Sequence, residues 1–131
     1  DTVSVFGSVG SSGGTKWRGG VLAPNYAIYG MPYSLSEVLR IDPAEGAAFT
    51  FGRGSYTPGP FGADFNGGVL SPRGIIYAMP FRMNAVLRID PANDTLTLMT
   101  PKCDILVGWP REAPPAGEAT RQAQLDCCRV R

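Results

Sequence analysis

The glycine-rich stretch 7–16 ends at a lysine and invites comparison with a phosphate-binding loop. In that motif a glycine directly precedes the lysine and a serine or threonine directly follows it, so that backbone amides and hydroxyl surround the phosphates and their metal ion. Here Thr15 precedes Lys16 and Trp17 follows it. No helical pattern follows either. We therefore interpret residues 7–16 as a connector between structural elements.

Catalytic and metal-binding chemistry is restricted by the absence of histidine from the sequence. Without histidine the chain has no Ser-His-Asp or Cys-His nucleophile and no histidine-ligated zinc site. The three cysteines are Cys103, Cys127 and Cys128, one ligand short of a four-thiolate zinc site. Reduced thiols are the leading interpretation, and a bridge from Cys103 to the later pair is the alternative in an oxidising compartment. We predict no catalytic residue, no cofactor and no bound metal.

Tyrosine and arginine recur at matched positions: Tyr29 and Arg40 return 48 residues later as Tyr77 and Arg88. Our leading interpretation is structural, with the tyrosines in a core and the arginines extended along a sheet or paired with a carboxylate next door. The alternative is a platform of aromatic rings and guanidinium groups for a sugar or other small ligand. Both pairs are therefore candidate ligand-platform residues.

Partner contacts are expected at aromatic residues that have no matched copy, and at apolar or aromatic residues of an unpaired outer strand and of the C-terminal segment. Aromatic side chains are enriched at protein interfaces, and extended apolar segments offer further contact area. The candidates are Val3 and Val5 near the start of the chain, Trp17, Tyr26 and Tyr56 in or near connectors, and Trp109 and Leu125 in the C-terminal segment.

An internal repeat must position these residues. Three blocks return with the same offset of 48 residues and no gap, and 16 of the 26 aligned positions from Gly19 to Ala44 are identical. A period of this length determines the fold class. The matched blocks are Gly19–Pro24 with Gly67–Pro72, Ile28–Pro32 with Ile76–Pro80, and Val38–Ala44 with Val86–Ala92.

Each repeat is expected to form four short antiparallel strands, because its blocks are rich in β-branched and aromatic residues and bounded by glycine or proline. Residues 42–46 should form a tight turn between the third and fourth strands, with Gly46 in a left-handed conformation. Asp94 takes that place in the second repeat, where it is tolerable but less suited. In the first repeat the expected strands are 20–23, 27–31, 37–41 and 48–51.

The predicted organisation is all-β, with a first repeat at about 17–52 and a second at about 65–100. A further outer strand is expected at 2–7, because Val3–Phe6 resembles the fourth strand. Residues 101–131 should form a C-terminal extension, with a Pro/Ala-rich arm at 110–120 and a short helix at 117–128. This extension is expected to gain order by docking on a partner.

The pattern GGVLxP, IYxMP and VLRIDPA resembles the tandem blades of NHL/YVTN-like and kelch-like β-propellers. It looks closest to blades of large repeat proteins from algae and other protists. It lacks the late tryptophan of kelch repeats and the Gly-His and Trp-Asp pairs of WD40 repeats. The resemblance implies propeller-type blades over about 17–100. A closed propeller usually has at least four blades, so two blades imply completion by further copies, by another subunit or by a longer repeat array. A fourth, partial alternative is that the C-terminal segment covers one face with Ile105–Val107 and Trp109.

Net charge and hydropathy restrict the classes of partner that we expect the chain to bind. Twelve basic residues balance 11 acidic ones, and no apolar run is long enough to cross a bilayer, so we expect neither nucleic acid nor a transmembrane segment. The chain opens at Asp1 without methionine, which is compatible with a processed organellar or secreted protein and with a piece of a longer chain. The compartment is left open.

The leading functional prediction is a non-catalytic, propeller-like interaction or scaffold module, an accessory subunit whose partners are other protein chains. One alternative is a lectin-like propeller fragment that binds carbohydrate or a small ligand. A second is a peripheral subunit on the aqueous face of a photosynthetic or respiratory membrane complex. A propeller enzyme such as a lactonase or lyase is the weakest alternative, because those sites draw histidines and carboxylates from several blades.

Overall fold

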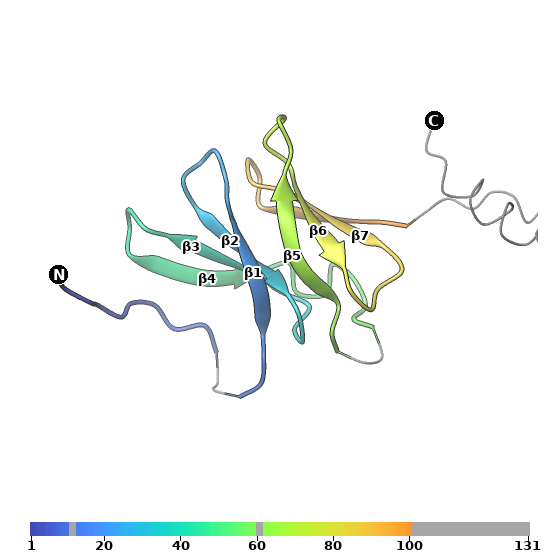
Figure 1. Cartoon of the computed structure of the whole chain (residues 1–131), viewed down its shortest axis with the longest axis horizontal. Helices are drawn as coiled ribbons and strands as arrows, with labels where there is room; N and C mark the ends of the chain where they lie inside the picture. Colours follow the sequence, from blue (N-terminus) through green and yellow to red (C-terminus); the bar gives the residue numbers. More distant parts are fainter. Residues whose placement is uncertain (11–12, 60–61, 101–131) are drawn as a thin grey trace, which may run out of the picture. The chain divides into compact units, whose positions relative to one another are not determined.

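A computed structural model describes residues 1–10, 13–59 and 62–100 of the chain. Eight β-strands form two four-stranded antiparallel sheets, each with its strands in sequence order (Figure 1). The prediction of an all-β fold with two such units is confirmed. The first sheet contains β1 (Trp17–Leu22), β2 (Ile28–Pro32), β3 (Val38–Asp42) and β4 (Ala47–Phe51), and the second contains β5 (Phe65–Leu70), β6 (Ile76–Pro80), β7 (Val86–Asp90) and β8 (Thr95–Met99).

The repeat offset reproduces the strand register as well as the strands. Tyr29 pairs with Val21 and Arg40 in the first sheet, and Tyr77 pairs with Val69 and Arg88 in the second. Because directly paired residues point to the same side of a sheet, matched residues of the two repeats lie on equivalent faces.

The first strand of each sheet, β1 and β5, contains an irregularity that the sequence pattern did not predict. The pairing shifts between Trp17 and Gly20 in β1 and between Phe65 and Gly68 in β5. Gly19 has φ of 76°, a left-handed value that glycine adopts without strain. This bulge lets β1 begin at Trp17, three residues before the expected start at Gly20.

The expected tight turns between the third and fourth strands are present in both sheets. Oδ1 of Asp42 accepts hydrogen bonds from the amides of Ala44 (3.2 Å) and Glu45 (3.3 Å). Gly46 has φ of 59°, and Asp94 holds the same conformation in the second sheet with φ of 49°. Aspartate is more strained than glycine in a left-handed backbone conformation, so the contacts of the Asp94 side chain must offset that strain.

The predicted outer strand at residues 2–7 does not form. Residues 1–9 have no strand assignment, and Val3 and Val5 are each 96% exposed. A strand requires a neighbour to satisfy its backbone, and in the described part of the chain both sheets are complete with four strands and leave Val3–Phe6 unpaired.

The C-terminal predictions concern residues outside the described part of the chain. The chain divides into two units between Met99 and Thr100. The arm at 110–120, the helix at 117–128, Trp109 and Leu125 all lie beyond the last described residue, as do the three cysteines. Within residues 1–10, 13–59 and 62–100, no helix has the length and apolar character to traverse a bilayer.

The core lies between the two sheets. One side of the first sheet, which we call the Tyr29 face, consists of Val21, Tyr29, Met31, Val38, Arg40 and Phe51. The side of the second sheet that packs against it, the Ile76 face, consists of Ile76, Ala78, Leu87, Ile89, Leu96 and Leu98. Buried members of both faces form one hydrophobic cluster, with Phe51, Leu96 and Leu98 packed at its margin.

Two glycine contacts define how closely the sheets approach. A Cβ placed on Gly19 would come within 2.8 Å of the Cα of Gly67, so β1 and β5 meet backbone to backbone (Figure 1). A Cβ on Gly68 would lie 2.9 Å from the sulfur of Met31. Glycine is therefore favoured by packing at both positions, and at Gly19 by its left-handed φ as well.

The connector between the sheets contributes to the core. The ring of Tyr56 is buried and meets Phe65 edge-on, with ring centroids 5.8 Å apart. Asp64 is also buried, and its Oδ1 accepts the amide of Gly59 at 2.9 Å. Tyr56 was predicted as a partner-contact residue, and in this structure its ring is buried under the connector.

Candidate functional site

A polar cluster at one end of the core joins the two sheets. The hydroxyl of Tyr29 donates to Oδ1 of Asp94 at 2.7 Å, and Nδ2 of Asn25 lies 3.0 Å from the same hydroxyl. Nδ2 of Asn25 also donates to the carbonyl of Pro91 at 3.0 Å. Tyr29 and Asn25 belong to the first repeat and the other two residues to the second. The cluster therefore fixes the register between the sheets.

Arg40 extends this cluster with charge. Its Nη2 lies 3.4 Å from Oδ2 of Asp42 on the same strand, and its Nε lies 3.7 Å from Oδ2 of Asp94 on the other sheet. The second contact is an ion pair without a hydrogen bond, because Nε has no hydrogen-bonding partner. Asp94 thus accepts from Tyr29 and faces a guanidinium, which offsets the cost of its left-handed backbone.

The environment of Tyr29 changes its acidity. Burial disfavours the phenolate, and the hydrogen bond to the Asp94 carboxylate disfavours it further, so the pKa of Tyr29 is raised above its usual value of 10.0. The hydroxyl therefore stays a donor wherever the fold is stable. This makes the Tyr29–Asp94 bond a structural link rather than a group poised for proton transfer.

The second sheet presents the counterparts of the Tyr29 face, identical except for Met99 in place of Phe51, but nothing in the described chain covers them. We call this side the Tyr77 face; it consists of Val69, Tyr77, Met79, Val86, Arg88 and Met99. Val21 is 8% exposed and its counterpart Val69 is 53% exposed, while Met31 is fully buried and its counterpart Met79 is 39% exposed. The two faces differ because the first one has a neighbouring sheet.

The polar end of the Tyr77 face repeats half of the cluster described above. Nη2 of Arg88 lies 3.1 Å from Oδ2 of Asp90, and the matching distance between Arg40 and Asp42 is 3.4 Å. Within the described residues, Tyr77 makes no side-chain hydrogen bond and Arg88 has no carboxylate from another sheet. No residue in the described ranges therefore takes the place of Asp94 on this face.

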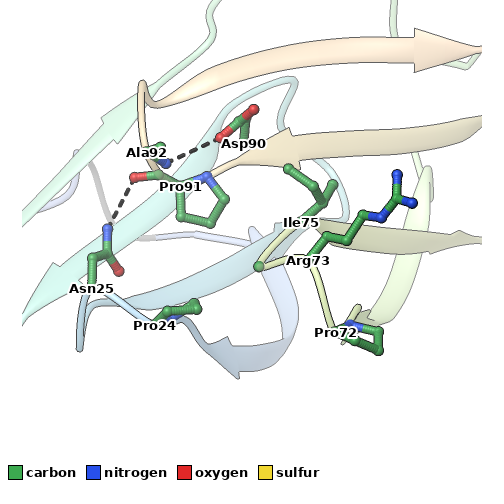
Figure 2. Close-up of a pocket in the computed structure, with 9 residues that line it drawn as sticks. Pro24, Asn25, Pro72, Arg73, Ile75, Asp90, Pro91 and Ala92 are labelled. Atoms are coloured by element: carbon green, nitrogen blue, oxygen red, sulfur yellow. Dashed lines mark hydrogen bonds between the residues drawn. The ribbon is translucent and has the colours of Figure 1, made fainter.

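A depression of about 360 Å³ lies beside the polar cluster, where three turns converge (Figure 2). The Asn25 to Pro91 hydrogen bond closes one side of it, and the Arg73 side chain is directed away from that bond on the other. It is lined by Pro24, Asn25, Pro72, Arg73, Gly74, Ile75, Asp90, Pro91 and Ala92. Its walls offer the guanidinium of Arg73 and the carboxylate of Asp90. That carboxylate is already engaged with Arg88 and the Ala92 amide, so the depression has no defined ligand geometry.

In the first repeat, the two predicted ligand-platform residues lie in the contact between the sheets. The ring of Tyr29 is fully buried between the sheets, and Arg40 is held by two carboxylates. Neither can offer a surface to a sugar. Tyr77 and Arg88 stay partly accessible, and the structure brings them together on one face by direct cross-strand pairing.

The predicted contact residues fall into different environments. Tyr26 is 80% exposed and has φ of 61°, a conformation that is strained for a bulky residue. Its repeat counterpart is Gly74, which adopts φ of 78° without strain. Trp17 is half-buried, and its Nε1 donates to the carbonyl of Glu37 at 2.8 Å. Tyr26 therefore offers a free ring, whereas Trp17 is engaged within the first sheet.

Sequence reasoning missed the two features that define the site. Asp94 appeared only as a less suitable residue for a turn, and Val69 and Met79 appeared only as repeat matches. A signal was available at Asp94, because the repeat changes there from glycine to a carboxylate at a left-handed position. No such signal exists for Val69 or Met79, which are identical in type to their buried counterparts.

Among residues 1–10, 13–59 and 62–100 there is no group of three or more side chains placed to hold a metal ion. No family model, curated protein or solved structure matches this chain.

Proposed function

We propose that the chain is a non-catalytic protein-interaction module built of two β-propeller-type blades, and that it acts as an accessory or scaffold subunit in a larger assembly. The observation that carries this proposal is the unequal exposure of matched residues. Val69 and Met79 expose side-chain area that Val21 and Met31 bury against the second sheet. An apolar face with a buried counterpart in the same chain is suited to receiving another sheet.

The rest of the Tyr77 face supports this use. Met99 is 46% exposed, and together with Val69 and Met79 it gives the face an apolar centre with Arg88 at its polar end. Protein interfaces have this arrangement, in which an apolar core is bordered by charged and polar groups. The strained, exposed Tyr26 supplies a further aromatic contact next to the depression between the turns.

The test is native mass spectrometry of the tagged chain recovered from its source. The wild type should carry companion chains, and the double variant Val69→Asp with Met79→Asp should lose them, because two carboxylates would be buried without partners. Both positions are exposed in the isolated chain, so its melting temperature should change little. The matched control is Leu22→Asp, an exposed apolar residue on the opposite side of the first sheet. A monomeric wild type would contradict the proposal.

A further inference from the structure

The contact between the two sheets shows what the Tyr77 face lacks. On the Tyr29 face, the second sheet supplies three things: the apolar Ile76 face, a close backbone approach at Gly67, and the carboxylate of Asp94. The carboxylate reaches Tyr29 and Arg40 from the turn between β7 and β8. Every residue of the Tyr29 face that contacts the second sheet has a counterpart on the Tyr77 face, in the same register.

We propose that the Tyr77 face binds a four-stranded sheet of the same repeat type on a partner chain, and that this sheet places an aspartate or glutamate of its third turn against Tyr77 and Arg88. The inference rests on the proposed function and specifies its partner. The incoming carboxylate accepts from the Tyr77 hydroxyl and pairs with Arg88, as Asp94 does with Tyr29 and Arg40.

The backbone of the second sheet leaves room for such a neighbour. A Cβ on Gly19 would meet Gly67, whereas a Cβ on Gly67 itself would meet nothing within 4 Å in the described chain. Both glycines have nearly the same left-handed φ, 76° and 75°. In the first sheet, β5 fills the space next to Gly19 of β1. The equivalent space next to Gly67 of β5 is open in the described chain, and a partner's inner strand would occupy it.

The charges favour a partner that is not a second copy of this chain. A second copy would present its first sheet, whose turn carries Gly46 where the second sheet carries Asp94. Gly46 has no carboxylate to pair with Arg88, and Glu45, the carboxylate of that turn, lies one residue before the position that Asp94 holds. Arg73 also stands at the repeat position of Asn25 and adds a second positive charge beside the face. Asp90 balances one of these two cations, and the remaining positive charge favours an acidic group from the partner.

The first sheet differs from the second on its outer side as well. Ala48 and Thr50 stand where the Ile76 face has Leu96 and Leu98, the leucines that pack at the margin of the core. A Cβ on Gly7 would lie 2.8 Å from that of Ala48, so the N-terminal segment already contacts this side. The outer side of the first sheet is thus a poorer match for the Tyr77 face than the Ile76 face is.

The experiment is carbodiimide cross-linking of the Arg88→Lys variant recovered from its source, with linked peptides identified by mass spectrometry. Carbodiimide joins an amine to a carboxylate only when the two are in contact, and lysine keeps the charge next to Asp90. The Arg40→Lys variant is the positive control and should link to Asp94 or Asp42 within the chain. We expect position 88 to link to an aspartate or glutamate of a companion chain as well as to Asp90.

Three results would overturn the inference: links to Asp90 alone while companions are present, links to a second copy of this chain, and links to residues 101–131 of the same chain. The absence of companions would instead contradict the proposed function, so the two failures can be told apart. Tyr77→Phe gives a second readout. It should leave the melting temperature of the isolated chain unchanged and weaken companion binding about tenfold, whereas unchanged binding would contradict the role of the hydroxyl.

Discussion

The Tyr29 hydroxyl and the Asp94 carboxylate form a 2.7 Å hydrogen bond between residues 65 positions apart, and this bond holds the two sheets in register. Asp94 occupies a left-handed position where the first repeat has Gly46. The second repeat therefore replaces the better turn residue with one that links the sheets. The exchange is a sign that packing between repeats has shaped the sequence.

Removing the Tyr29 hydroxyl tests this link. Tyr29→Phe should lower the free energy of unfolding by about 2 kcal/mol, because it leaves a carboxylate without its hydrogen-bond donor. Tyr77→Phe is the matched control and should change it by less than about 0.5 kcal/mol, because its hydroxyl has no side-chain partner among the described residues. Urea denaturation measures both. Equal effects of the two substitutions would contradict the role given to Asp94.

The close approach of β1 and β5 predicts a second difference between matched residues. Gly19→Ala and Gly67→Ala both place alanine at a left-handed φ, which costs about 1–2 kcal/mol. Gly19→Ala should cost more, because its Cβ would lie 2.8 Å from the Cα of Gly67, while a Cβ on Gly67 meets open space. Thermal unfolding of the two variants measures the difference. A larger loss for Gly67→Ala would show that the sheets are not packed in this way.

The stability of the fold should fall at high pH. Burial raises the pKa of Tyr29, and it raises the pKa of Tyr56, next to the buried carboxylate of Asp64, still further. Above pH 10 the unfolded chain loses these protons while the folded chain keeps them, so unfolding becomes more favourable as pH rises. The free energy of unfolding should fall by about 1.4 kcal/mol per pH unit for each of the two tyrosines.

The measurement is urea denaturation at a series of pH values from neutrality to above 10. Tyr29→Phe should reduce the slope above pH 10, because it removes one of the two ionising groups. Below pH 10 the contribution of both tyrosines is fully present and the variant should run parallel to the wild type. A wild-type profile that stays level above pH 10 would contradict the burial of these hydroxyls.

Local patterns in the sequence predicted the strands and turns well, because strand and turn preferences depend on neighbouring residues. The Asp42 turn and the left-handed Gly46 formed as expected, and the strand boundaries moved by few residues except at Trp17, where the Gly19 bulge extends β1. Val3–Phe6 has the composition of a strand, but a strand also needs a partner with free backbone groups. Composition alone cannot supply that information.

The candidate site was less predictable because it depends on which sheet face is covered. Tyr29 and Tyr77 are the same residue in the same local pattern, yet one is buried and the other is half-exposed. Only the stacking of one sheet on the other distinguishes them. The burial of Tyr56 was unpredictable for a related reason, since a tyrosine in a glycine-rich connector gives no indication of whether its ring turns inward.

Methionine oxidation by dilute peroxide, followed residue by residue, tests most directly whether the Tyr77 face is an interface. Met79 is exposed and its counterpart Met31 is buried, so in the isolated chain Met79 should oxidise before Met31. In the chain recovered with its companions, Met79 should be protected to nearly the level of Met31. Oxidation of Met79 at the same rate in both preparations, with companions present, would contradict the account.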